Sequence, residues 1–398
     1  MSTADVIELR RSVKEQLRQR VLEAIQAVLD EEVAAALGVE RHERGKQRQG
    51  YRHGATQRVV TTATGRQTLT VPRARVRDGQ GGTREFQSEL LPRYQRRTRE
   101  VDEAILNVYL AGANSRRIKR ALEPLLGDTH LSKSAISRVV ARLKALFAQW
   151  RDRDLSSETY AIVFRDGFHL KVRLAKRVVA VPVLVALGVA EDGSKRLIAL
   201  ELAVSESSAA WGGFVAGLLD RGLQLPRLLV TDGHGGLKKA RGAWPAVAVQ
   251  RCTQHKWENL KRHCPTHAHA ELRRDWSAIV QAQDGAAARR AYDAMLTKWR
   301  TLCPPVVRSL DEAGLELLTF YAFPKPMWKG LRTTNSIENL NREFRRRTKT
   351  QGSFASEDAA LTLLFGLVAF RQIELRKITG YSHVAALLAD HALTGEAA

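Results

Sequence analysis

Short apolar runs of strand character in the middle of the chain constrain its fold more than any other feature. They are rich in branched aliphatic residues and are separated by turn residues, such as the Glu-Asp-Gly-Ser sequence at 191–194. One apolar helix is predicted among them, at residues 209–219. Strands joined in part by a helix are typical of an α/β domain with a mixed sheet. The predicted strands are residues 160–164, 178–189, 197–204 and 225–230.

A long helical stretch follows this predicted sheet. From residue 257 to 320 the apolar positions, Trp276 and Trp299 among them, recur at helical spacing. A chain of 398 residues is long enough for two or three hydrophobic cores. We therefore predict one α/β core that is interrupted by an α-helical insertion. The predicted boundaries are 156–256 for the first part of the core, 257–327 for the insertion, and 328–398 for the second part with its C-terminal helices.

The N-terminal region, residues 1–99, is predicted to combine a helix with a basic hairpin. Apolar residues at helical spacing predict a helix over 4–37, with Gly38 as its stop. A hairpin is expected around Gly65, and its flanks are polar and rich in arginine. We expect these flanks to be loops that are extended against DNA or poorly ordered without it. The expected strands are 58–62 and 67–71, and the expected loops are 41–58 and 72–99.

Three helices are predicted over residues 100–155. Gly127 and Asp128 form a turn before the third, and Ser132 is its predicted N-cap. A short glycine turn before a helix rich in Ser, Lys and Arg is typical of a helix-turn-helix that binds DNA. The alternative is a helical bundle whose charges are merely solvated. The candidate DNA contacts are Arg116, Arg117, Lys133, Ser134 and Arg138.

The chain carries a large excess of positive charge, with 64 Lys and Arg residues against 42 Asp and Glu and a net charge of +22. Such a balance is typical of nucleic-acid binding and, less often, of binding to an anionic membrane surface. The longest apolar stretch, 359–370, is too short to span a bilayer. The first residues form no apolar secretion core, and three cysteines imply no disulfide framework. We expect a cytoplasmic or nucleoid-associated protein without a membrane partner.

Three acidic residues stand out in this basic chain. Asp166 and Asp232 each follow a predicted strand and precede a glycine, and Glu338 lies at the start of a predicted helix. Ligands of open α/β sheets gather at the carboxyl ends of strands. Carboxylates that a basic chain holds together are best explained by divalent cations acting on a nucleic-acid backbone. Three suffice for two Mg²⁺ ions, with Mn²⁺ as a substitute, because water and phosphate oxygens complete the metal shell. The alternative for the two aspartates is a pair of Asp-Gly turns.

Glu338 also has a structural alternative. Its spacing from Asn335 is that of a capping box with Asn335 as N-cap, and a glutamate in that position can still lean toward a metal. Positions i+4 and i+7 from Glu338 are Arg342 and Arg345, so a ridge of arginines shares its face. Such a ridge suits a phosphate backbone. The candidate DNA contacts on this helix are Arg342, Arg345, Arg346, Arg347 and Lys349.

Two Cys-x-x-His pairs follow the second aspartate. Cys252 and His255 form the first pair, and Cys264 and His267 form the second. One interpretation is a zinc site built from all four residues, although the pairs are close together and Pro265 disturbs the second. The other interpretation is that Cys252 and His255 pack within the fold or lie near DNA.

Several of these strings together resemble the Mutator-type transposases of bacterial insertion sequences. The resemblance runs in the family's order from about residue 15 to 380, and the motifs are highly specific only as a set. The N-terminal strings are Tyr51-Arg-His-Gly54, Val71-Pro-Arg-Ala-Arg75 and Leu131-Ser-Lys-Ser134. The C-terminal strings are Asp166-Gly-Phe-His-Leu-Lys-Val-Arg173, Thr231-Asp-Gly-His-Gly-Gly-Leu237, Gln250-Arg-Cys-Thr-Gln-His255 and Thr334-Asn-Ser-Ile-Glu338-Asn-Leu-Asn341.

This resemblance implies a ribonuclease-H-like core with a DDE triad at Asp166, Asp232 and Glu338. It also implies that Cys252 and His255 are a family signature. The implied activity is Mg²⁺-dependent cleavage and joining of double-stranded DNA at the terminal inverted repeats of an insertion sequence and at a target. The implied assembly is at least a dimer in a bacterial cytoplasm. Two rivals remain, a nuclease that does not join DNA and a DNA-binding protein without catalysis.

Overall fold

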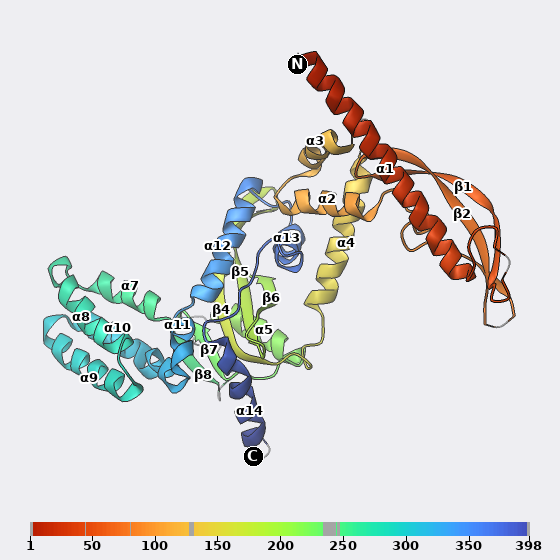
Figure 1. Ribbon diagram of the computed structural model, residues 1–398. Helices are drawn as coiled ribbons and strands as arrows, with labels where there is room; N and C mark the ends of the chain where they lie inside the picture. The colour runs from red at the N-terminus through yellow and green to blue at the C-terminus, as the bar shows by residue number, and fades with distance from the viewer. Residues whose placement is uncertain are drawn as a thin grey trace. The chain divides into compact units, whose positions relative to one another are not determined.

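The computed structural model describes residues 3–43, 45–79, 81–126, 131–233, 244 and 247–395 (Figure 1). The chain divides into two compact units, Met1–Arg142 and Leu143–Ala398, and each is described by itself. Helix α4, Lys133–Arg151, begins in the first unit and ends in the second. Within the described residues no helix is both long and apolar enough to cross a membrane.

The first unit is built on one long helix and a β-hairpin. Helix α1 ends at Leu37, and Gly38 follows with a φ of +66° that favours glycine, which confirms the predicted helix and its stop. Helices α2 and α3 come next, and they agree with the prediction of helices after residue 100. The elements of this unit before α4 are α1 Thr3–Leu37, β1 Gly50–Thr62, β2 Gly65–Arg77, β3 Thr83–Glu85, α2 Arg99–Leu110 and α3 Ser115–Leu126.

The hairpin is longer than predicted. Strands β1 and β2 pair from Gly50↔Val76 to Thr62↔Gly65, so the predicted loops 41–58 and 72–99 are partly strand. The reason lies in apolar residues of the hairpin that pack along helix α1. Leu69 shares a core cluster with Leu29 of α1, and beyond the predicted end of that strand Ala74 shares a second cluster with Val33 and Leu37 of α1. Arginines on the exposed positions hide this alternation in the sequence.

The beginning of α4 agrees with its predicted cap. The Ser132 hydroxyl accepts a hydrogen bond from the Ala135 backbone N–H at 3.1 Å, which confirms Ser132 as the residue that caps this helix. The predicted turn at Gly127 and Asp128 lies outside the described residues.

The second unit contains a mixed five-stranded sheet, as predicted. Its strand order is β6-β5-β4-β7-β8, with β4, β5 and β6 antiparallel and with β7 and β8 parallel to β4. The strands are β4 Tyr160–Leu174, β5 Arg177–Ala190, β6 Lys195–Leu202, β7 Leu228–Thr231 and β8 Ala248–Arg251.

Strand β4 continues well past the predicted end at Phe164, and this corrects the position of Asp166. Asp166 lies inside the strand rather than at its end. The long apolar strand β5 pairs with all of β4, and Ala175 and Lys176 close the hairpin with φ values of 45° and 67°. Two residues with positive φ make the tight turn that suits the twist of paired strands. The pairing of β4 with β7, however, reaches only Arg165, so Asp166 still follows the end of the parallel part of the sheet.

Helices cover both faces of this sheet (Figure 1). Helix α5, Ser208–Asp220, places Trp211 and Phe214 in a core cluster with Val163 of β4. Helix α12, Asn335–Thr348, packs on the other face, where the Phe344 and Phe168 rings stack with centroids 5.8 Å apart. Two further helices complete the C-terminal part, α13 Glu357–Ala369 and α14 Val384–Gly395.

A set of helices with a core of its own separates β8 from α12 in the chain. Trp257, Trp276 and Trp299 are buried together there, as expected from the helical spacing of the apolar residues. The main helices of this insertion are α7 Thr253–His263, α8 His269–Val280, α9 Gly285–Leu302 and α10 Pro304–Ala313. Short helical turns and α11, Trp328–Leu331, lead from there to α12.

Gly188 of β5 tests the packing of the sheet. A Cβ at this position would lie 2.3 Å from Cδ1 of Tyr160 and 2.7 Å from Cδ1 of Ile198. We expect Gly188→Ala to lower the free energy of unfolding by about 1–3 kcal/mol, the usual cost of overpacking. Gly213→Ala in α5 is the matched control. A Cβ there meets no atom within 4 Å, and alanine in a helix interior stabilises by roughly 0.5–1 kcal/mol. Urea denaturation followed by tryptophan fluorescence measures both, and equal midpoints for the two variants contradict the packing described.

Candidate active site

The parallel strands end in one row of paired residues. Arg165 pairs with Thr231, and Thr231 pairs with Arg251. The residues that follow this row are Asp166, Asp232 and Cys252. Because side chains alternate along β4, Asp166 points to the face opposite Arg165, where Asn341 of α12 contacts it. Asp232 follows the neighbouring strand and interacts electrostatically with Asp166.

Asp166 is held by two hydrogen bonds. The Asn341 side-chain amide of α12 donates to Oδ2 at 2.8 Å, and the Gly167 backbone N–H donates to Oδ1 at 2.9 Å. The pKa of Asp166 is raised to about 7, first by burial and then by the charge of Asp232, with a smaller contribution from Glu338. The structure thus brings the three predicted carboxylates close enough to act on one another.

Glu338 lies in the first turn of α12, but the predicted capping box is wrong by one residue. Thr334, not Asn335, is the N-cap, and its side chain does not cap a helix N–H. The Thr334 hydroxyl instead donates a hydrogen bond to Oε1 of Glu338. The backbone N–H of Thr334, which a capping glutamate would accept from, already donates to Sγ of Cys252 at 3.4 Å. The tertiary contact with Cys252 replaces the local motif.

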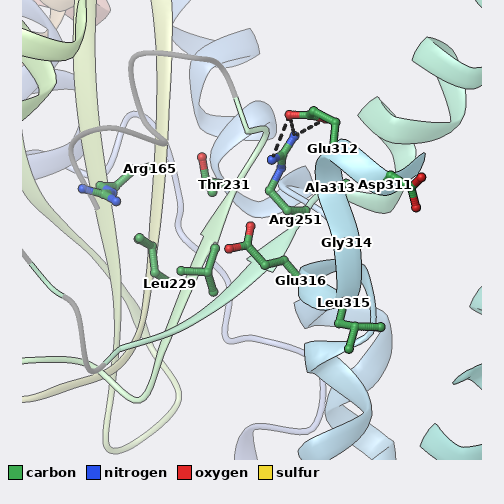
Figure 2. Close-up of a pocket in the computed structure, with 11 residues that line it drawn as sticks. Arg165, Leu229, Thr231, Arg251, Asp311, Glu312, Ala313, Gly314, Leu315 and Glu316 are labelled. Atoms are coloured by element: carbon green, nitrogen blue, oxygen red, sulfur yellow. Dashed lines mark hydrogen bonds and ion pairs between the residues drawn. The ribbon is translucent and has the colours of Figure 1, made fainter. Parts of the chain in front are cut away.

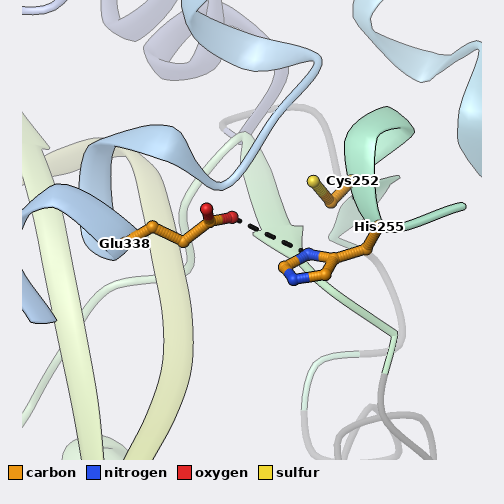
Figure 3. A group of neighbouring side chains, drawn as sticks. All are labelled: Cys252, His255 and Glu338. Atoms are coloured by element: carbon orange, nitrogen blue, oxygen red, sulfur yellow. Dashed lines mark ion pairs between the residues drawn. The ribbon is translucent and has the colours of Figure 1, made fainter. Parts of the chain in front are cut away.

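Cys252, His255 and Glu338 form a compact group beside the aspartates (Figure 3). Nδ1 of His255 lies 3.7 Å from Oε1 of Glu338 and 3.4 Å from Oγ1 of Thr334. The hydrogen bond with Cys252 is the main cause that raises the pKa of His255 to about 9. Burial opposes ionisation of the Cys252 thiol, but hydrogen bonds with His255 and Thr334 outweigh it and lower the thiol pKa.

The second Cys-x-x-His pair does not join this group. Within the described part of the chain, Cys252, His255 and Glu338 are the one set of three ligand residues that converges. Cys264 is buried in the core of the insertion, and its thiol donates to the carbonyl oxygen of Pro265 at 3.6 Å. The interpretation that all four residues of the two pairs bind one zinc ion is therefore wrong.

The opposite face of the same sheet edge carries a cavity of about 410 Å³ (Figure 2). Arg165, Thr231 and Arg251 line it together with α10 and the turn that follows, Gly314–Leu317. Arg165 is fully buried, and none of its guanidinium nitrogens has a hydrogen-bond partner among the residues that the structure describes. Burial lowers its pKa to about 10, and its guanidinium carbon lies 5.1 Å from the centre of the Trp244 ring. Asp166 and the buried cation of Arg165 thus occupy opposite faces of strand β4.

Arg251 ties the sheet edge to the insertion. Its guanidinium lies 3.4 Å from Oε1 of Glu312, which also accepts from Lys256 at 2.7 Å through Oε2. Gly233 packs directly on Arg251, with a φ of +80°, and a Cβ there would lie 1.8 Å from Nε of Arg251. The turn after Asp232 therefore requires glycine.

The predicted DNA contacts lie on three helices, and most of them are exposed. On α12, Arg345 lies 5.5 Å above the Phe168 ring, and Arg346 pairs with Glu343 at 2.6 Å. Arg347 is partly buried and donates to the carbonyl oxygen of Gln372 at 3.0 Å, so it contacts the protein itself. The exposed candidates are Arg116 and Arg117 on α3, Lys133, Ser134 and Arg138 on α4, Arg342, Arg345 and Arg346 on α12, and Lys349 just after α12.

Two residues of the site were quoted in the sequence analysis only as the ends of one motif, without a role. Asn341 contacts Asp166, and Thr334 contacts Cys252, His255 and Glu338. Asn341 is three positions after Glu338, so helical spacing places both residues on the same face of α12 and could have indicated its role. No local pattern indicates the role of Thr334, because its partner Cys252 is 82 residues away.

The raised pKa of Asp166 predicts a pH-dependent stability without metal. An aspartate in the unfolded chain has a pKa of about 3.9, so the folded state holds this proton more tightly and stability falls as the pH rises from about 4 to 7. Asp166→Asn removes this effect, and the Asn341 amide can turn to accept from the new amide. With EDTA present, we expect the variant to be more stable than the wild type by up to about 4 kcal/mol at pH 8 and equally stable at pH 4.

Denaturant titrations at several pH values measure this difference. Asp293→Asn is the matched control, because Asp293 is exposed and pairs with Arg289 on α9. A difference between Asp166→Asn and the wild type that does not change with pH contradicts the prediction.

Comparison with known sequences agrees with these motifs. The family described as "Transposase, Mutator family" matches residues 2–374. The transposase of insertion sequence IS406 from Burkholderia multivorans is 34% identical over 87% of this chain and 89% of its own length. The IS1081 transposase of Mycobacterium tuberculosis is 32% identical over 93% and 89%, and the IS256 transposase of Staphylococcus aureus is 29% identical over 89% of both. The chain belongs to the Mutator family of transposases.

Proposed function

We propose that this protein is the DDE-type transposase of an insertion sequence. It binds the terminal inverted repeats of its element in double-stranded DNA, cuts there, and joins the ends to target DNA. The observation that carries the proposal is the convergence of Asp166, Asp232 and Glu338, which are far apart in the sequence, at one edge of a sheet. An edge of this kind is where α/β proteins place their ligands.

The sheet supports a ribonuclease-H-like core. Three antiparallel strands, β4 to β6, are followed by two short strands parallel to β4, and the first two carboxylates lie beside the end of this parallel part. The third carboxylate comes from a helix after an insertion, as the resemblance to DDE enzymes implies. The helices α2, α3 and α4 supply the three helices that a helix-turn-helix needs.

The donor atoms at this edge suit Mg²⁺ or Mn²⁺. The three predicted ligands are all carboxylates, and Mg²⁺ prefers oxygen ligands and takes only a few from protein. Asp166, Asp232 and Glu338 would hold two such ions, and these would supply activation of the attacking hydroxyl and stabilisation of the leaving oxygen. Burial and, after it, repulsion by Asp232 and Glu338 raise the pKa of Asp166, and a bound cation would offset both.

Other residues of the chain hold these ligands and the DNA. Asn341 and Thr334 orient the carboxylates of Asp166 and Glu338 through their hydrogen bonds. The exposed arginines Arg342 and Arg345 follow Glu338 on one helix face, where a DNA backbone that enters the site would meet them. The candidates on α3 and α4 would bind the terminal repeats. Joining two ends of an element requires at least a dimer, and the DNA places the protein in the bacterial cytoplasm at the nucleoid.

A cleavage assay tests the proposal. Full-length protein is incubated with labelled terminal-repeat DNA, a target plasmid and Mg²⁺, and both cut and joined products are measured. We expect Glu338→Gln and Asp232→Asn to lower product formation by at least about 100-fold, because loss of an outer-shell partner alone costs 10- to 100-fold. Asp293→Asn is the control that keeps activity, because Asp293 is an exposed residue of α9 that pairs with Arg289.

The products also separate the rivals. Cut DNA without joined DNA identifies a nuclease of similar core. Binding of the terminal repeats without Mg²⁺-dependent cutting identifies a DNA-binding protein without catalysis. Cutting that persists in Asp232→Asn contradicts the triad.

Asn341 is expected to act as a positioning residue for Asp166. Asn341→Ala removes the donor at Oδ2 of Asp166 and leaves that carboxylate free to turn. We expect the half-saturating Mg²⁺ concentration for cleavage to rise by roughly 10-fold or more, in line with other outer-shell substitutions, while saturating Mg²⁺ restores much of the rate. A lower rate with an unchanged Mg²⁺ requirement contradicts this role. Asn341→Gln, which keeps an amide, is the conservative comparison.

A further inference from the structure

One group of ligand atoms beside the carboxylates differs from them in chemistry. Sγ of Cys252, a ring nitrogen of His255 and a carboxylate oxygen of Glu338 all lie within 4.8 Å of one another (Figure 3). Cys252 is buried, whereas His255 and Glu338 are partly exposed and open to an ion from solvent. A thiol, an imidazole and a carboxylate that share one small space are a typical ligand set for zinc.

The fold holds these three atoms on regular elements. Cys252 is the N-cap of α7 and follows β8 directly, and His255 lies in the first turn of α7. Glu338 lies in the first turn of α12. The two helix beginnings are joined because the Thr253 backbone N–H and hydroxyl both donate to the carbonyl oxygen of Arg332 at 2.9 Å. A site supported in this way needs little rearrangement to bind an ion.

The distances suit an ion of the size of Zn²⁺. Zinc binds sulfur at about 2.3 Å and nitrogen or oxygen at about 2.0–2.2 Å, so its tetrahedral ligands lie somewhat under 4 Å apart. The 3.7 Å between Nδ1 of His255 and Oε1 of Glu338 already falls in that range. Sulfur ligands also discriminate between metals, because thiolates bind Zn²⁺ and related soft ions, whereas Mg²⁺ prefers oxygen.

We propose that Cys252, His255 and Glu338 form a Zn²⁺ site, with water in the fourth position, and that this site competes with the catalytic metals for Glu338. Zinc binding at this site does not require any of the three residues to be catalytic. The competition rests on the function proposed above, in which Glu338 is a ligand of the catalytic ions. Zinc at this site withdraws Glu338 from that role and inhibits DNA cleavage.

Cobalt is the probe for binding, because Co²⁺ replaces Zn²⁺ in such sites and reports its ligands by absorption. Full-length protein is stripped with EDTA, desalted under anaerobic conditions and titrated with CoCl₂. We expect one equivalent to produce the visible bands of a tetrahedral ion and a thiolate-to-cobalt charge-transfer band in the near ultraviolet. One equivalent of ZnCl₂ should then abolish both. Absence of a charge-transfer band overturns the proposal.

Variants identify the sulfur and the other ligands. Cys252→Ser should abolish the charge-transfer band, and His255→Gln and Glu338→Gln should each weaken Co²⁺ binding by at least about 10-fold. Cys264→Ser and Cys303→Ser are the matched controls, because both thiols are buried in the insertion core and should leave the spectrum unchanged. Circular dichroism checks that each variant is folded, and the His255→Gln result decides the question if Cys252→Ser does not fold. A band that survives Cys252→Ser or depends on Cys264 overturns the proposal.

Cleavage in Mg²⁺ with added ZnCl₂ then tests the competition. We expect Zn²⁺ to inhibit cleavage by the wild type, and a higher Mg²⁺ concentration to relieve this inhibition. For His255→Gln, the inhibitory Zn²⁺ concentration should rise by at least about 10-fold. If zinc binds but does not inhibit cleavage, the zinc site stands and the proposed competition for Glu338 is wrong. A protein that shows the cobalt spectrum but never cleaves DNA refutes the proposed function while the zinc site stands, so the two failures are distinct.

Discussion

The register of three parallel strands is the constraint on which the rest of the site depends. Arg165, Thr231 and Arg251 are paired across β4, β7 and β8, and the chain places Asp166, Asp232 and Cys252 immediately after them. Alternation along β4 directs Asp166 to one face and Arg165 to the other. A shift of one residue in β4 would exchange this carboxylate for a cation at the face covered by α12.

Electrostatics explains which groups surround the carboxylates at this edge of the sheet. Burial first, and then repulsion by the neighbouring carboxylates, raises the pKa of Asp166. Hydrogen bonds from Asn341 and Thr334 and the imidazole of His255 offset part of it. Cys252 and Glu338 both lie at helix beginnings, where the helix dipole favours negative charge.

The sequence predicted the order of elements better than their ends. Apolar runs identified the strands of the mixed sheet, and helical spacing identified the insertion, because burial imposes a period on the sequence. The true lengths of β1 and β4 were missed, since the first half of β1 and the second half of β4 mix basic with apolar residues and become strands only through a partner. The cap of α12 was assigned to Asn335 for a similar reason. A capping box is a local pattern, whereas the contact of Thr334 with Cys252 joins residues 82 positions apart.

The sequence by itself determined which side chains are available: three carboxylates after strands or at a helix start, a Cys-x-x-His pair, ridges of arginine, and the family to which the chain belongs. The tertiary structure alone decided which of them meet. It joined Cys252 and His255 to Glu338 rather than to the second Cys-x-x-His pair, gave Asp166 its partner Asn341, and buried Arg165 on the opposite face. The physical reason is that residue type and period are local properties, whereas the register of strands and the packing of α12 on the sheet are set by pairings between distant segments.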